Sequence, residues 1–273
     1  MIRIADLHTH SKASDGQFCP SEVVRMAKDS GIEVLALTDH DTISGLDEAI
    51  DAGREYGVQI LPGVELSARE YHTFHILGYG FDPKNSILAE ALSSMRQGRN
   101  SKALRIIDYL KDSGVHIEFP EVQVLSGNGV IGRPHFARLL LEKGYISNYR
   151  DAFDLYLDTD EYHEQVETEK PSVVKCIEWI KSSGGKVSLA HPYQIGISDE
   201  EMSRLVCDLT DLGLDAIECY YPKQTPEMTF FYVSLAKKYG LHITGGSDFH
   251  GEKVKPGITL SRWELELDWL VNG

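Results

Sequence analysis

Short apolar segments recur along the chain and are separated by longer segments with a different pattern. Each short segment ends in polar residues, which is typical of a buried strand. Most of the longer segments place apolar residues every three or four positions, as amphipathic helices do. The pattern predicts strands at Ile2–Leu7, Val34–Thr38, Gln59–Val64, Thr73–Gly78, Lys186–Ala190, Asp215–Cys219 and His242–Thr244.

The helices between these strands show recognisable start and stop signals. Pro20 opens the first helix, and Gly31 is expected to stop it. Thr42 or Ser44 is expected to cap the next helix, with Asp41 as a further N-terminal cap. Further helices are predicted at Pro171–Ser183, Ser198–Leu212 and Thr225–Tyr239.

Alternating strands and helices favour a parallel sheet in an α/β fold. Seven predicted strands fit a (β/α)7 barrel better than a short Rossmann unit. No Gly-x-Gly-x-x-Gly motif follows any predicted strand, so a dinucleotide site has no support.

Residues 94–169 depart from this alternation of strands and helices, and their pattern is almost wholly helical. Helices are predicted at Arg96–Ser113, Pro134–Lys143 and Tyr149–Tyr156, and the acidic run Asp158–Glu161 is expected at the surface or in a mobile lip. A connection this long is usually functional or a small domain of its own. The predicted organisation is therefore a barrel from residues 1–93 and 170–273, with residues 94–169 as a helical insertion that caps the substrate.

Composition narrows the possible functions. The 273 residues are 42% hydrophobic and carry a formal charge of −15, which excludes a basic coat for long duplex nucleic acid. A small anionic substrate would need a local positive site, and the eleven histidines are the first hint of one. No secretory signal, membrane span or Cys-x-x-Cys pair is present, which predicts a cytoplasmic protein with reduced thiols.

Side chains suited to bind metal ions collect near the ends of the predicted strands. In barrels the carboxyl ends of the strands form the active face, so these residues are expected to converge. Alternate residues on a strand point to the same side, and His-x-His and Asp-x-His pairs can each present two ligands. Imidazole suits Zn, Mn or Fe, and a carboxylate can bridge two ions. The candidate ligands are His8, His10, Asp15, His40, Glu65, His75, His191, Asp248 and His250.

Together these segments resemble the motifs of the PHP (polymerase and histidinol phosphatase) superfamily. The resemblance extends from end to end of the chain. Within the superfamily, the chain resembles the branch of metal-dependent phosphoesterases that act on nucleoside 3′,5′-bisphosphates and short oligoribonucleotides. The resemblance lies in the motif Gly132-Arg133-Pro134-His135 and in Asp15. The superfamily motifs are Asp6-Leu7-His8-Thr9-His10, Leu37-Thr38-Asp39-His40-Asp41, Gly63-Val64-Glu65, Ala190-His191-Pro192 and Gly246-Ser247-Asp248-Phe249-His250.

The resemblance implies a distorted (β/α)7 barrel that holds two to three divalent ions, with Mn²⁺ as the first choice and Fe²⁺ or Zn²⁺ as alternatives. By position, the first ion would be held by His8, His10, Glu65 and Asp248. Glu65 would bridge to a second ion on His75 and His191. A third would lie on Asp15, His40 and His250.

Three divalent ions and three carboxylates would give a site of about +3, which suits phosphate. The implied mechanism is attack of a metal-bound hydroxide on phosphorus, with His8, His10, Asp248 and Asp39 as the catalytic residues.

Several other residues have a functional and a structural interpretation. Asp39 is expected to orient a ligand histidine or move a proton, and otherwise is a strand-end acid. Arg133 and His135 are expected to bind a second phosphate, although Arg133 can equally pair with a surface acid. Ser247 is expected to contact phosphate or to serve in a turn. Tyr221 is one of three residues, with Tyr220 and Lys223, that can line the pocket.

The sequence thus predicts a hydrolase of phosphoric ester bonds. The preferred activity is removal of the 3′-phosphate of nucleoside 3′,5′-bisphosphates, 5′→3′ degradation of short RNA, or both. The alternatives are a histidinol-phosphate phosphatase or other small phosphomonoesterase and, from another class, a non-catalytic binding module. The expected partner is a small phosphorylated substrate, with no membrane, while the oligomeric state and the pathway stay open.

Overall fold

The computed structural model describes residues 1–127, 129–166 and 170–271. These residues form an eight-stranded sheet in the order β7-β6-β5-β4-β3-β2-β1-β8. The strands are β1 (Ile2–Thr9), β2 (Val34–Leu37), β3 (Gln59–Ser67), β4 (His75–Tyr79), β5 (Lys186–Leu189), β6 (Ala216–Tyr220), β7 (His242–Gly245) and β8 (Trp263–Glu266).

The segment that follows β7 returns to β1 and nearly closes the sheet into a barrel. Thr9 and Phe249 form a parallel bridge. The Asp248 amide donates to the His8 carbonyl at 2.8 Å, and the His10 amide donates to the Phe249 carbonyl at 2.9 Å. The predicted α/β barrel, with a strand in each of the seven expected places, is confirmed.

Two strands correct the expectation of a parallel sheet. β4 is antiparallel to both β3 and β5, with Ser67 opposite His75, and the unpredicted β8 is antiparallel to β1. A connection as short as residues 68–74 can join only antiparallel strands, since a parallel crossover needs a dozen residues or more. As a result, the first residue of β4, His75, lies at the edge where β3 ends.

Helices pack around the sheet because each buries an apolar face against it. Alternate residues of β2 belong to two separate buried clusters, Leu35 and Leu37 to one and Val34 and Ala36 to the other, as expected for a strand that is covered on both faces. These helices are α1 (Pro20–Asp29), α2 (Leu46–Tyr56), α7 (Val173–Ser182), α8 (Asp199–Asp211), α9 (Pro226–Tyr239) and α10 (Asp268–Val271).

The start of α2 differs from the prediction. Its N-cap is Gly45, so capping by Asp41, Thr42 or Ser44 is wrong. The Asp41 carboxylate instead accepts hydrogen bonds from the Ser67 amide and from Arg99. Asp41 therefore ties the end of β2 to a distant helix.

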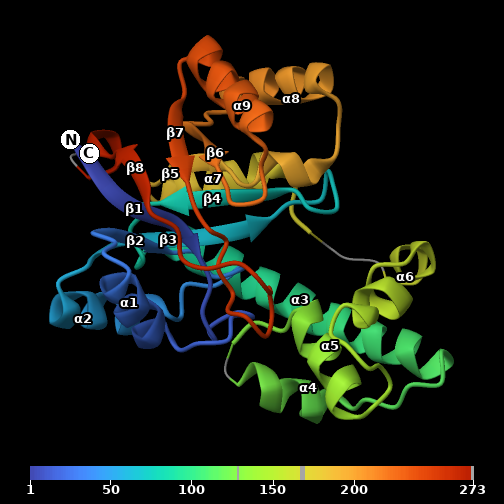
Figure 1. Cartoon of the computed structure of the whole chain (residues 1–273). Coiled ribbons are helices and arrows are strands. Elements are labelled where there is room, and N and C mark those ends of the chain that lie inside the picture. The colour runs from blue at the N-terminus through green and yellow to red at the C-terminus, as the bar shows by residue number, and fades with distance from the viewer. Residues whose placement is uncertain (128, 167–169, 272–273) are drawn as a thin grey trace.

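The insertion between β4 and α7 is helical, and Figure 1 shows its α3–α6 region extending away from the barrel. A second buried cluster, which includes Ile106, Phe136, Leu140 and Tyr162, holds these helices together. Helices α4 and α6 were not predicted, and the predicted boundary at residue 169 lies outside the described residues. The helical elements are α3 (Ser86–Asp112), α4 (Phe119–Ser126), α5 (Arg133–Glu142), a π-helical turn (Phe153–Leu157) and α6 (Asp160–Gln165).

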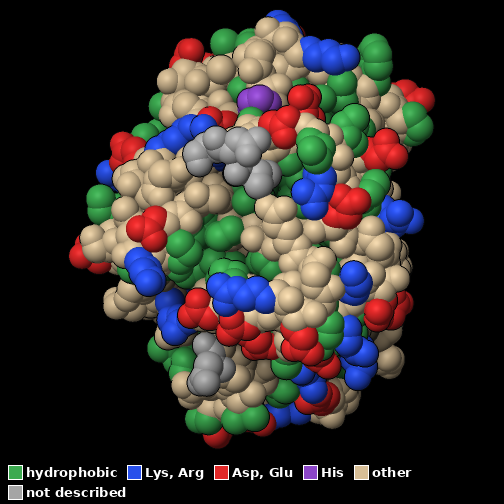
Figure 2. All heavy atoms as spheres, turned by 90° about the vertical axis from the view of Figure 1, so that its left-hand side faces the viewer, with side chains coloured by type: hydrophobic (Ala, Val, Ile, Leu, Met, Phe, Trp, Pro, Cys, Tyr) green, Lys and Arg blue, Asp and Glu red, His purple; other side chains and the backbone are tan. Residues whose placement is uncertain are grey.

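The surface agrees with the acidic composition. Figure 2 shows acidic and basic side chains interspersed on the face that it presents, without a continuous basic patch there. In the described part of the chain, no helix is both long and apolar enough to cross a membrane.

We expect Gly246→Ala to destabilise the barrel closure. A Cβ at this position would lie 2.1 Å from the His8 Cβ and 2.7 Å from Glu218 Oε1. Overpacking of this kind costs about 1–3 kcal/mol of unfolding free energy, measurable by urea denaturation. Ser101→Ala is the control, because this residue is exposed on α3 and the change adds no bulk to the interior. Equal loss of stability in the two variants would contradict the proposed crowding.

Candidate metal centre

All nine candidate ligands come together at one edge of the barrel. Each of them belongs to at least one group of three or more donors whose ligand atoms lie within 4.8 Å of one another. They are supplied by the ends of β1, β2, β3, β5 and β7 and by the first residue of β4. The groups are His8, Glu65 and His191; His8, His10 and Asp248; His40, Glu65 and His75; and His10, Asp15, His40 and His250.

Glu65 occupies the centre of this arrangement. It is fully buried at the carboxyl-terminal half of β3. Its Oε1 lies 2.8 Å from His75 Nδ1 and 2.9 Å from His191 Nε2. Its Oε2 lies 3.3 Å from His8 Nε2, 3.2 Å from His10 Nε2 and 2.9 Å from His40 Nδ1. One carboxylate thus contacts five imidazole rings, as a bridging ligand would.

The remaining acids, Asp15 and Asp248, contact histidines of the same cluster. Asp248 Oδ1 is 3.4 Å from His10 Nε2 and 3.3 Å from His250 Nδ1. Asp15 Oδ1 is 3.3 Å from His250 Nε2. Asp15 and Asp248 therefore share the imidazole of His250.

The electrostatics of the site follow from burial among opposite charges. Burial by itself would raise the pKa of Glu65, yet that pKa lies well below its ordinary value because His40, His8 and His75 surround the carboxylate. The pKa of Asp248 is lowered in the same way by Lys255 and His8. The acids of this cluster are therefore held in the ionised form that metal ions require.

Unsatisfied buried atoms test whether metal ions fit here. Among the described residues, His8 Nε2, His10 Nε2, His40 Nδ1 and Glu65 Oε2 are buried and have no hydrogen-bond partner. They lie close together without hydrogen-bond geometry, and buried polar atoms of this kind need a partner. A set of imidazole nitrogens and carboxylate oxygens is the donor set of Mn, Fe and Zn sites. The cluster thus fits divalent metal ions.

Glu218 on β6 is a functional residue that the sequence analysis missed. Its Oε1 lies 3.0 Å from His8 Nδ1, and its Oε2 accepts a hydrogen bond from the His191 amide at 2.7 Å. A carboxylate on the far nitrogen of a metal-binding histidine fixes the ring and its tautomer. The signal in the sequence was a single acid within the buried strand Ala216–Tyr220.

Asp39 and Ser247 lie beside the cluster, and none of their side-chain hydrogen bonds among the described residues is to a ligand side chain. Asp39 accepts hydrogen bonds from Ser11 Oγ at 2.7 Å and from Ser14 Oγ at 2.6 Å, which orders the loop that carries Asp15. The Ser247 amide donates to Asp6 Oδ1 at 2.9 Å. Proton transfer by Asp39 and phosphate binding by Ser247 stay predictions.

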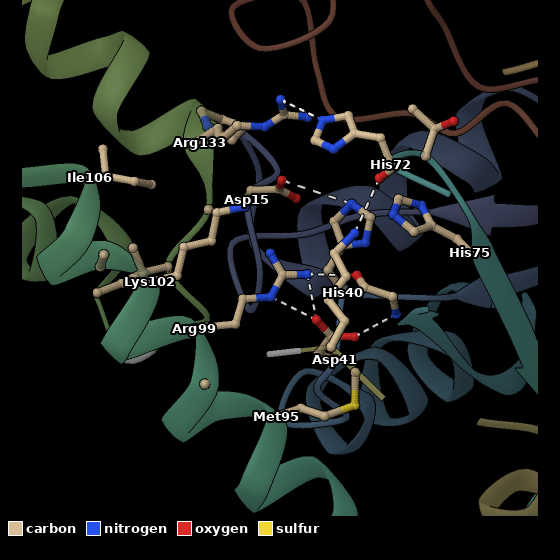
Figure 3. Close-up of a pocket in the computed structure, with 18 of the residues that line it drawn as sticks. Asp15, His40, Asp41, His72, His75, Met95, Arg99, Lys102, Ile106 and Arg133 are labelled. Atoms are coloured by element: carbon tan, nitrogen blue, oxygen red, sulfur yellow. Dashed lines mark hydrogen bonds and ion pairs between the residues drawn. The ribbon is translucent and has the colours of Figure 1, made fainter. Parts of the chain in front are cut away.

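A cavity of about 220 Å³ adjoins the cluster, between the barrel and the insertion. Asp15, His40 and His75 line one side of it. Figure 3 shows Arg99 and Lys102 of α3 on the opposite side, with Arg133 above them. Lys170 also lines the cavity, so candidate metal ligands and four basic side chains share one space.

These four cations differ in their partners. Arg133 pairs with Asp158 Oδ1 at 2.5 Å, Arg99 pairs with Asp41, and Lys170 donates to the His72 carbonyl at 3.1 Å. Lys102 has no acidic partner among the described residues. Burial and the neighbouring Arg133, Arg99 and Lys170 lower the pKa of Lys102 to about 6. An anion in the cavity would relieve this repulsion.

The two residues of the insertion that were predicted to bind phosphate, Arg133 and His135, lie in different surroundings. Arg133 lines the cavity, whereas His135 is mostly buried, and its Nδ1 accepts a hydrogen bond from the Gly132 amide at 3.0 Å at the start of α5. Sequence reasoning missed Arg99, Lys102 and Lys170. The spacing of Arg99 and Lys102, which places both on one helix face, was the available signal.

Known proteins resemble this chain in sequence and structure. The PHP domain family model matches residues 6–167. A 5′-3′ exoribonuclease from Haemophilus influenzae is 35% identical over 251 residues, which cover 92% of this chain and 91% of the relative. A 3′,5′-nucleoside bisphosphate phosphatase from Chromobacterium violaceum is 35% identical over 247 residues, covering 90% and 86%.

A solved structure supports the same assignment. The crystal structure of a candidate metal-dependent phosphoesterase from Bifidobacterium adolescentis matches with a TM-score of 0.86 and 30% identity, covering 98% of this chain and 94% of the other. The chain belongs to the PHP domain family. The predicted enzyme class, a hydrolase of phosphoric ester bonds, is confirmed at the level of this family.

We expect Glu218→Gln to weaken metal binding while the fold is kept. The amide no longer supplies the negative charge that orients His8 and raises its basicity, and losses of this kind cost about 10–100-fold in metal affinity. Metal affinity is measured by competition with a chelator of known strength. Glu266→Gln, at an exposed position of β8, is the control. Equal affinities of the two variants would refute this role for Glu218.

Proposed function

We propose that this protein uses two to three divalent ions, with Mn²⁺ as the first choice, to remove the 3′-phosphate of nucleoside 3′,5′-bisphosphates. The same site would release nucleotides from the 5′ end of short RNA. The names of the H. influenzae and C. violaceum relatives support both substrates. The proposed ligands are the nine residues of the cluster.

The observation that carries this proposal is the shared cavity. One side presents metal ligands and the other presents Arg99, Lys102, Arg133 and Lys170. A substrate with two phosphates can place one against the metal ligands and the other against these cations. A phosphomonoester such as histidinol phosphate has no second phosphate to place against the cations. A non-catalytic module would need neither the metal ligands nor the cations.

Bound divalent ions would supply Lewis acidity, neutralise phosphate charge and lower the pKa of water. The protein residues hold those ions and orient the substrate. The oxygen of water bonds to phosphorus, the bond from phosphorus to the 3′-oxygen breaks, and the 3′-oxygen takes a proton. In both substrates the departing group is the same 5′-phosphorylated nucleotide. One site can therefore perform the phosphatase and the exonuclease reaction.

The buried acids also contribute by holding the ligand geometry before substrate arrives. Glu65 and Glu218 fix His8 from its two nitrogens, at 3.3 Å and 3.0 Å. The serines that bind Asp39 order the loop that presents Asp15. Because these side chains are already in position, the chemical step does not have to supply the free energy of rearranging them.

A phosphate-release panel tests the proposed function. With Mn²⁺, we expect adenosine 3′,5′-bisphosphate to be hydrolysed faster than histidinol phosphate or adenosine 3′-monophosphate, and a short 5′-phosphorylated RNA to yield nucleoside 5′-monophosphates. Chelation should abolish the activity, and added Mn²⁺ should restore it. Full activity after chelation would contradict a metal-dependent reaction. A preference for histidinol phosphate would instead favour the alternative substrate.

We expect Lys102→Met to impair recognition of the second phosphate. A hydrogen bond to a charged group contributes about 1.5–3 kcal/mol, so KM for adenosine 3′,5′-bisphosphate should rise by about tenfold or more. KM for adenosine 3′-monophosphate, which lacks the 5′-phosphate, should change far less. Lys111→Met, at an exposed position of the same helix, is the control. Arg133→Ala should lower the same selectivity, and parallel changes in KM for the two substrates would refute the role of either residue.

A further inference from the structure

The metal centre has a second side, away from the cavity. Tyr221 donates a hydrogen bond from its hydroxyl to Asp248 Oδ2 at 2.9 Å. Lys255 contacts the same carboxylate oxygen and donates to the Tyr221 hydroxyl at 2.8 Å. Neither Tyr221 nor Lys255 lines the cavity between the barrel and the insertion. The ligand cluster is therefore flanked by cationic groups on two sides.

An aromatic ring accompanies this second side. Tyr193 follows the candidate ligand His191 by two residues and is only half-buried. Its ring centroid lies 5.1 Å from that of Tyr221, with an angle of 43° between the planes. Gln194, the next residue, lines the cavity and donates to the Tyr221 hydroxyl at 3.2 Å. A substrate that spans the metal centre from the cavity would pass this pair.

Further cations surround the aromatic pair. The Lys255 ammonium lies 5.5 Å from the centre of the Tyr221 ring. Lys223 is exposed and follows Tyr221 by two residues, in the segment between β6 and α9. Half-exposed aromatic rings beside cations are the usual means of binding a single-stranded nucleotide chain.

We propose that Tyr193, Lys223 and Lys255 form a platform for the downstream nucleotide of a short RNA. This inference rests on the proposed function, in which the 5′-terminal nucleotide occupies the cavity side. In a bisphosphate, the reacting phosphorus is esterified only to the 3′-oxygen of its own nucleoside. In RNA, the same phosphorus is also esterified to the 5′-oxygen of the next nucleotide.

The platform gives that next nucleotide a place to bind while the reaction proceeds. The oxygen of water bonds to phosphorus, the bond to the 3′-oxygen of the terminal nucleotide breaks, and that oxygen takes a proton. The phosphate stays on the downstream nucleotide, whose base stacks on Tyr193. The remaining strand thereby acquires the 5′-phosphate that the cavity binds in the next cycle.

The ratio of two activities tests the platform. In the Mn²⁺-loaded enzyme, kcat/KM is measured for 5′-phosphorylated diadenylate and for adenosine 3′,5′-bisphosphate. We expect Tyr193→Ala to lower the diadenylate-to-bisphosphate ratio about tenfold, the size of one lost stacking contact. Lys223→Ala should lower it in the same direction. Tyr193→Phe keeps the ring and should keep the ratio, and Lys237→Ala, at an exposed position of α9, is the control for loss of a surface lysine.

The outcomes separate the two proposals. An unchanged ratio in both Tyr193→Ala and Lys223→Ala overturns the platform and leaves the proposed function intact. Hydrolysis of the bisphosphate but not of diadenylate by the unmodified enzyme overturns the platform and the exonuclease part of the proposed function, and leaves its phosphatase part standing. Hydrolysis of neither substrate overturns both proposals. A lowered ratio with Tyr193→Ala that is restored in Tyr193→Phe supports the platform, since the ring and not the hydroxyl is then required.

Discussion

A single buried carboxylate organises this protein. Glu65 is fully buried and lies within 3.3 Å of nitrogens from five histidines. An isolated charge in such a position would be strongly disfavoured, so it requires partners that supply positive charge. Those partners come from β1, β4 and β5 and from the segment after β2. The barrel must therefore close around Glu65 in one register, and the register in turn fixes the metal centre.

The sequence located the residues that come together in the cluster because its signals were local. Each ligand follows or ends a recognisable apolar strand, and parallel strands bring their carboxyl ends to one edge. His75 was placed on the fourth strand correctly, although the direction of that strand was not foreseen. The short connection at residues 68–74 held the decisive information, since only an antiparallel pair can be joined so closely.

The residues that sequence reasoning missed depend on contacts between distant parts of the chain. Glu218 acts on His8, 210 positions away, and Arg99 of the insertion binds Asp41 of the barrel. No periodicity within one segment can reveal such pairs. Asp41 is a second example. Its local sequence favoured a role as a helix cap, but in the structure it forms a long-range ion pair with Arg99. Lys102 stands out only in the folded chain, where it has no acidic partner among the described residues.

The reversed direction of β4 also explains the length of α3. The chain leaves β4 at the edge opposite the metal centre, and α3 must carry it back along the barrel, as its course in Figure 1 shows. At 1.5 Å per residue, the segment from Ser86 to Lys102 spans about 24 Å. The length of α3 thus sets the distance between the barrel wall and the cavity. Loss of one residue within it would turn the cationic face by about 100°, so the position of Arg99 and Lys102 in the cavity depends on the number of residues in this helix.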